Sequence, residues 1–223
     1  MNRMITVKGV GSATVRPDYI TISMTAQSVR KDYNEAMEDA AERIEKLQDA
    51  AVRSGYAKED LKTVSFNVDT RYDNVRDAQG NYKREFSGYA CLYHLKLSFD
   101  LDSGQLAKVI SAISESGAKP ELSIAFTVKN PAEVNEILLK DAAQNARAKA
   151  ELLCKASGCE LGRLFSIDYN VNKLNLVSET RYAMEDGIQP LMAMNKRSVP
   201  EIEPDDIHVS DTVTFTWEIL VAD

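Results

Sequence analysis

The chain has 223 residues, of which 44% are hydrophobic and 27% charged, so it can fill a packed core. Its formal net charge of −7 argues against a surface that follows a phosphate backbone, which excludes a nucleic-acid-binding protein of the usual basic kind. No apolar run approaches the roughly 18 residues of a membrane span, and residues 1–15 alternate like a strand rather than a signal peptide. The sequence as written predicts a cytoplasmic protein, or a periplasmic or other extracytoplasmic one if an export signal has been removed.

Two strands with alternating apolar residues are expected first, at residues 5–15 and 20–26, separated by Arg-Pro-Asp at 16–18. Proline fixes φ and aspartate can bond nearby backbone, so this tripeptide predicts a tight turn and the two strands a hairpin. A helix is expected next, because Asp32 and Glu35 have the spacing of a capping box and apolar residues then recur at helical intervals.

The middle of the chain predicts a second hairpin, with strands at 64–72 and 89–99 on either side of a turn-rich segment. Ser103 is predicted to cap a short helix that ends at Gly117, and residues 122–128 return as a strand. The strand-helix-strand unit therefore occurs twice, which suggests two pseudo-symmetric halves.

A long helix is expected from Asn130 and Pro131 to about Ser157, because a cap followed by proline at the first helical position favours a helix start. Strands are then predicted at 165–171 and 208–221. The order ββαββαβαββ indicates an α+β fold, a largely antiparallel sheet with helices packed on one face. Small side chains, which let a helix lie close to a sheet, crowd the middle of the long helix: Ala142, Ala143, Ala146, Ala148 and Ala150.

Between the last two strands lies an excursion, residues 178–206, with no steady period. A long excursion inside a compact domain is usually functional or disordered. Methionine is flexible and common at adaptable binding surfaces, so we expect assembly or partner contact here, with a mobile loop as the alternative. The candidate contact residues are Met184, Pro190, Leu191, Met192 and Met194.

Several short motifs, in this order along the chain, together resemble the SIMPL-domain family. They are Val7-Lys-Gly-Val-Gly11, Val15-Arg-Pro-Asp18, Gly88-Tyr89, Gly117-Ala118, Ala148 to Ala150, and Pro200 to Trp217. The likeness covers nearly the whole chain and implies a single SIMPL-like domain over residues 1–223. The sequence departs from most bacterial members in lacking an export signal, and from the family pattern where Pro-Asp-Asp at 204–206 replaces Pro-Gly.

The resemblance also implies a kind of function. The family is named after a kinase-associated signalling adaptor, and its bacterial members are mostly exported proteins linked to oxidative-stress defence that are not known as enzymes. Some of them resemble ring or barrel assemblies of many copies. By analogy, self-association is expected here.

The chemical candidates are few. Cys154 and Cys159 are the candidate thiol site, although the C-terminal end of a helix raises a thiol pKa and so opposes a reactive thiolate. His94 and His208 are too few for most metal sites. The Gly-Val-Gly sequence at 9–11 lacks the third glycine and following helix of a phosphate loop, so it predicts a close crossing of another element instead.

We therefore expect no catalytic, cofactor or metal site, and no membrane span or nucleic-acid partner. The predicted function is that of a non-enzymatic, self-assembling or adaptor-type domain, a homo-oligomer or one that binds a protein partner, linked to stress defence through the resemblance. Two alternatives stay open. One is a thiol-based redox or stress-protection protein, and the other is a small-molecule-binding domain.

Overall fold

The computed structural model describes residues 3–76, 81–170, 174–180, 182–183 and 203–221. The strands divide between two antiparallel sheets rather than one, and the chain splits into two compact units, each considered by itself. Unit 1 comprises Met1–Asp18, Thr127–Glu179 and Pro204–Asp223, and unit 2 comprises Tyr19–Phe126 and Thr180–Glu203. The α+β class and the approximate element order are confirmed.

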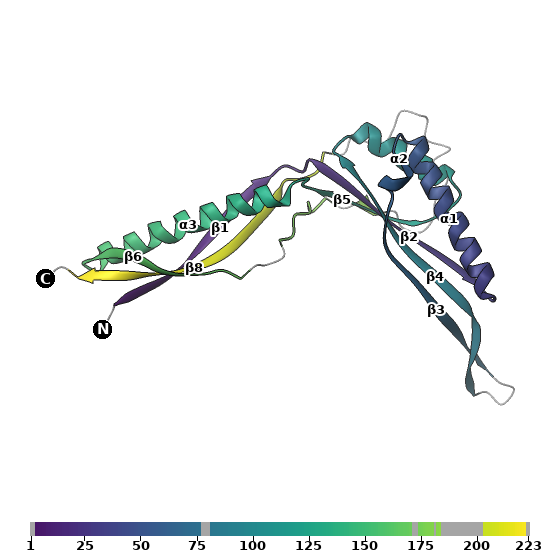
Figure 1. Ribbon diagram of the computed structural model, residues 1–223, viewed down its shortest axis with the longest axis horizontal. Helices are drawn as coiled ribbons and strands as arrows, with labels where there is room; N and C mark the ends of the chain where they lie inside the picture. Colours follow the sequence, from purple (N-terminus) through teal and green to yellow (C-terminus); the bar gives the residue numbers. More distant parts are fainter. Residues whose placement is uncertain (1–2, 77–80, 171–173, 181, 184–202, 222–223) are drawn as a thin grey trace. The chain divides into compact units, whose positions relative to one another are not determined.

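Unit 1 is a three-stranded sheet with one long helix lying along it (Figure 1). The strand order is β1 (Met4–Val15), β8 (Ile207–Val221), β6 (Cys159–Asp168), and the helix is α3 (Pro131–Ala156). The apolar face of β8 packs against α3. The buried residues of this core are Val7, Ala142, Ala146, Ala150, Val213, Phe215 and Trp217.

Helix α3 lies unusually close to β1. A Cβ atom added to Gly9 or to Gly11 would overlap the carbonyl oxygen of Ala142 or of Leu138, respectively, so only glycine fits at these two positions. The predicted close crossing is therefore confirmed. Of the five alanines assigned to the core face, however, Ala148 is exposed, because helical spacing turns it away from the sheet.

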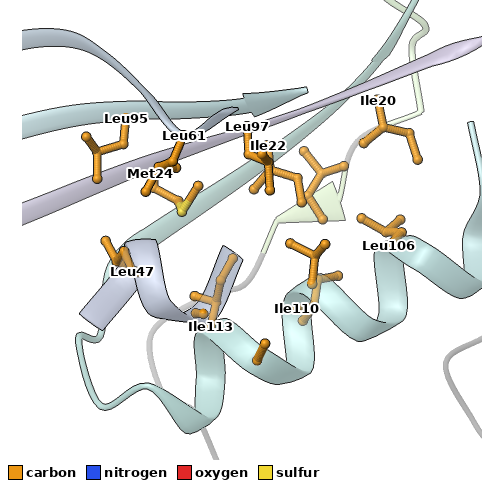
Figure 2. Close-up of a cluster of buried hydrophobic side chains, with 14 of the residues drawn as sticks. Ile20, Ile22, Met24, Leu47, Leu61, Leu95, Leu97, Leu106, Ile110 and Ile113 are labelled. Carbon is orange, nitrogen blue, oxygen red and sulfur yellow. The ribbon is translucent and has the colours of Figure 1, made fainter. Parts of the chain in front are cut away.

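Unit 2 is a five-stranded sheet with two helices. The order is β3 (Lys62–Arg76), β4 (Tyr82–Asp100), β2 (Tyr19–Arg30), β5 (Glu121–Thr127), β7 (Tyr182–Ala183). The helices are α1 (Tyr33–Arg53) and α2 (Ser103–Glu115), with a 3-10 turn at Lys58–Asp60. Figure 2 shows Leu106, Ile110 and Ile113 of α2 facing the strand residues Ile20, Ile22 and Leu97.

The predicted first hairpin is wrong, whereas the second, β3 with β4, is confirmed. Strand β1 pairs with β8, and β2 pairs with β4. Asp18 does not close a local turn: its backbone N–H donates to Thr127 O at 3.1 Å, and its carboxylate accepts from the N–H of Lys129 at 2.7 Å. The connection at 16–18 therefore bonds to the last residue of β5 and to the segment just after it.

The predicted helix starts are correct to within a residue, but the capping groups differ. Asp32 caps α1 by accepting the N–H groups of Asn34 and Glu35, as expected. The cap of α2 is Asp102, which accepts from Gln105 N at 2.9 Å, and not Ser103. Strand β6 begins six positions before the predicted residue 165, directly after the end of α3.

Candidate functional site

Side chains of α3 bond the backbone of β1 along the edge that faces away from β8. Asp141 Oδ2 accepts the N–H of Ser12 at 2.8 Å, and Asn145 Oδ1 accepts the N–H of Val10 at 3.1 Å. One turn further, Lys149 Nζ donates to the carbonyl of Lys8 at 3.4 Å. The bonding residues are four positions apart on α3, a rise of about 6.0 Å, and two positions apart on β1, a rise of about 6.7 Å. Because these two rises are nearly equal, successive helix side chains reach successive backbone groups of the strand.

We call these three contacts the α3 ladder. They bond backbone groups of β1 that would otherwise be open to a neighbouring strand. Backbone groups at a sheet edge are a template for pairing with another chain unless something covers them. The α3 ladder covers the edge of β1 over residues 8–12.

The opposite edge of this sheet is β6, and within the described residues it pairs only with β8. Three apolar side chains stand exposed on it: Leu164 at 47%, Phe165 at 64% and Ile167 at 57% of their full areas. Leu164 and Ile167 pair with Trp217 and Phe215, so they lie on the face of the sheet that α3 packs against. We call Leu164, Phe165 and Ile167 the β6 patch.

Charged residues stand at both ends of the β6 patch. Arg163 forms an ion pair with Glu218, Nε to Oε2 at 3.2 Å, and Asp168 pairs with Thr214. Glu218 and Thr214 alternate with Trp217 and Phe215, so Arg163 and Asp168 lie on the other face of the sheet. Register shifts around Leu164 let Leu164 and Ile167 share one face although three positions separate them.

The β3 edge of unit 2 differs from β6 in its aromatic contacts. Both strands carry charged residues, among them Lys62, Arg71 and Arg76 on β3. Several aromatic rings of β3 already have partners on β4: Phe66 packs on Tyr93 at 4.6 Å, and the guanidinium of Arg84 lies 4.5 Å from the ring centre of Tyr72. Exposed apolar residues nevertheless remain there, Val64 among them.

The structure brings together the two candidate thiols. Cys154 is buried in the last turns of α3, and the partly exposed Cys159 begins β6. The Cys159 thiol donates to the carbonyl oxygen of Cys154 at 3.2 Å. Burial raises the pKa of Cys154, and interaction with the Cys159 thiol raises it further. The direction agrees with the sequence-based expectation.

The other candidates do not converge. His94 Nδ1 lies 3.1 Å from Thr25 Oγ1 in unit 2, and His208 Nδ1 lies 3.1 Å from Thr14 Oγ1 in unit 1. Over the described residues, no group of three or more His, Cys, Asp or Glu side chains is arranged to hold a metal ion. The candidate contact residues Met184, Pro190, Leu191, Met192 and Met194 lie outside the described residues.

Sequence reasoning missed a buried carboxylate. Asp211 sits on the α3-facing side of β8 and is only 5% exposed. It accepts a hydrogen bond from the Tyr169 hydroxyl at 3.1 Å and one from the N–H of Thr212 at 2.7 Å. Burial raises the pKa of Tyr169, as does the hydrogen bond to Asp211. The signal in the sequence was an aspartate at a position of β8 where the alternation predicts an apolar residue.

Asp211 also lines a hollow of about 370 Å³ in unit 1, together with Glu179, Asp205, Asp206 and His208. Its lining mixes acidic and apolar residues, and the alternative that the chain is a small-molecule-binding domain stays a prediction. None of the helices in the described part of the chain combines the length and apolar character needed to cross a membrane.

Comparison with known proteins gives one family and a few relatives. The family model described as "SIMPL: Protein of unknown function (DUF541)" matches residues 5–217. The chain is 29% identical to the "26 kDa periplasmic immunogenic protein" of Brucella melitensis over 73% of this chain and 65% of that protein, and 28% identical to its Brucella abortus counterpart over the same shares. It therefore matches less than two thirds of the length of these relatives. It is also 22% identical to "Uncharacterized protein YggE" of Edwardsiella ictaluri, over 96% of this chain and 86% of the relative.

Proposed function

The chain belongs to the SIMPL family, and on that premise we propose that it is a non-enzymatic subunit of a homo-oligomer that assembles through the β6 edge. The observation that carries the proposal is the contrast between the two edges of one sheet. The edge of β1 is covered by the α3 ladder, whereas β6 presents three exposed apolar side chains. An apolar edge strand is the part of a sheet most prone to pair with another chain.

The proposed occupant of this edge is a second copy of the same strand, running antiparallel. A two-fold axis between Phe165 and Ser166 brings Leu164 of each copy opposite Ile167 of the other. The same register brings Arg163 of each copy opposite Asp168. In both pairings the two opposed residues lie on the same face of the sheet. Leu164 therefore lies opposite an apolar residue, and the two symmetric Arg163–Asp168 pairs each join opposite charges.

A charge swap tests this register. Arg163→Glu alone places two carboxylates opposite each other at two symmetric positions, and Asp168→Lys alone does the same with two cations. Either change is expected to weaken self-association roughly tenfold or more, since cross-strand pairs contribute up to about 1 kcal/mol each. The double variant restores opposite charges and is expected to recover most of the affinity, as measured by sedimentation equilibrium.

Arg147→Glu is the matched control, because Arg147 is an exposed residue of α3 that forms a local ion pair with Glu151. It makes the same change in charge away from β6 and is expected to leave association unaltered. If the double variant associates no better than either single one, the proposed register is wrong.

We also propose an extracytoplasmic location, the second of the two alternatives predicted from the sequence. The support is the name of the Brucella relatives, which calls them periplasmic. Cell fractionation with antibody detection checks this, and recovery in the cytosolic fraction would contradict it. The link to oxidative-stress defence and a role as an adaptor stay predictions.

A further inference from the structure

The junction between α3 and β6 brings Cys154 and Cys159 together. Four residues separate Cys154 from Cys159, and Gly158 within them has a positive φ of 71° that turns the chain back. The turn points the Cys159 thiol at the Cys154 carbonyl, 3.2 Å away, so the two cysteines are neighbours in space.

The pair is reachable from outside. A hollow of about 470 Å³ is lined by both cysteines together with Glu151, Lys155 and Leu161. Cys159 is partly exposed at its wall, whereas Cys154 is buried. A small oxidant can therefore approach Cys159 first. The third cysteine, Cys91, is buried in unit 2, where its thiol contacts Met37 Sδ at 3.7 Å.

We propose that Cys154 and Cys159 form a reversible intramolecular disulfide that ties the last turn of α3 to the first residue of β6. This is a modification site that goes beyond the proposed assembly role and does not depend on it. The co-reactant is a small dialkyl disulfide such as glutathione disulfide.

The exchange proceeds in two steps. The Cys159 sulfur, as thiolate, attacks one sulfur of glutathione disulfide, forming a mixed disulfide and releasing one glutathione thiolate. The Cys154 sulfur then attacks the Cys159 sulfur, which forms the intramolecular bond and releases the second thiolate. The two protons lost by the cysteines are taken up by the two glutathione thiolates. The protein dithiol loses two electrons, and the oxidant gains them as two thiols.

The raised pKa of Cys154 fits the second position in this sequence. A thiol that stays protonated is a poor first nucleophile, but it competes well once the target sulfur is held beside it. The exchange is therefore expected to stop at the intramolecular disulfide, without lasting glutathionylation.

The test uses the full-length folded chain in a glutathione redox buffer, quenched with acid and read by mass spectrometry. The wild type is expected to lose the mass of two hydrogen atoms, with Cys154 and Cys159 linked in a peptide map. Cys154→Ser is expected to stop with one glutathione on Cys159. Cys159→Ser is expected to react at least roughly tenfold more slowly, because its remaining thiols are buried.

Three results overturn the proposal. One is a wild type that accumulates glutathione on Cys159 as fully as Cys154→Ser does. Another is a disulfide bond that involves Cys91 or that joins two chains. The third is full alkylation of both thiols in native protein after equilibration with excess oxidant. Cys91→Ser is the matched control and is expected to behave as the wild type.

Discussion

At the scale of single residues, two glycines decide how closely α3 and β1 pack. Neither Gly9 nor Gly11 is among the glycines with positive φ, so the requirement is for space and not for an unusual backbone conformation. The backbone atoms of α3 lie where a β-carbon would stand. A side chain at either position must therefore push the helix away from the strand.

Gly11→Ala is expected to lower the free energy of unfolding of unit 1 by about 1–3 kcal/mol, the usual cost of overpacking. The only tryptophan of the chain, Trp217, is buried in this unit, so urea unfolding followed by tryptophan fluorescence reports on it directly. Ser12→Ala is the control, because Ser12 is exposed on the same strand. Equal stability of the two variants would contradict the close packing.

Asp39 gives a pH dependence at the same scale, in unit 2. The Ser28 hydroxyl, followed by the guanidinium groups of Arg43 and Arg30, lowers the pKa of Asp39 below its ordinary 3.8. The folded state thus favours the charged carboxylate. Its stabilising effect is fully present above the unfolded-state pKa and is lost as the pH falls through the lower folded-state value.

Asp39→Asn is therefore expected to cost about 1 kcal/mol near neutral pH. The cost shrinks as the pH falls below the ordinary pKa, because the wild-type carboxylate becomes protonated too. Chemical unfolding followed by circular dichroism over this pH range measures the difference, with Glu38→Gln as a control for the charge change. A cost that stays constant down to low pH would refute this assignment.

At the scale of elements, the α3 ladder explains why one edge of the unit 1 sheet is closed. The double variant Asp141→Ala with Asn145→Ala removes both acceptors while keeping good helix formers. The N–H groups of Ser12 and Val10 then lose their partners, and their hydrogen exchange is expected to quicken roughly threefold to tenfold.

Hydrogen exchange read by NMR resolves these two amides. Gln144→Ala, on the exposed side of α3, is the matched control and is expected to leave both rates unchanged. Unchanged rates in the double variant would mean that the ladder does not protect the edge.

Local patterns predicted most elements but not their pairing. The alternation in β1 and β8 and the helical spacing in α1 and α3 identified these segments, because burial of one face leaves a period in the sequence. The partner of β1 is β8, some 200 positions later in the chain. No turn signal encodes such a distant pairing, so the Arg-Pro-Asp sequence at 16–18 suggested a hairpin that does not form.

The candidate site was predictable only in part. Cys154 and Cys159 are close in sequence, so their proximity could be anticipated. The β6 patch was missed because its strand was expected to begin at residue 165, which left the Arg163 and Leu164 positions outside it. The α3 ladder depends on polar residues that face a strand edge, and such residues look like ordinary solvated positions on a helix.

At the scale of the whole molecule, the chain contains two units with separate cores, and the family model spans both. The assignment of residues 1–223 to one domain stays a prediction. The two sheets differ in how their edges are covered, and β6 is the edge where apolar side chains, a covered opposite edge and complementary charges coincide. Assembly through β6 is therefore the central claim at this scale.

The most direct test is the absolute mass in solution, measured by size-exclusion chromatography with light scattering over a dilution series in reductant. The wild type is expected at a defined multiple of 24.8 kDa. Ile167→Lys, a change at a 57% exposed position, is expected to shift the mass toward a smaller species, whereas Val64→Lys on the other sheet is not. A wild type that stays at 24.8 kDa at every concentration, or an Ile167→Lys variant that matches it in assembly, would contradict the account.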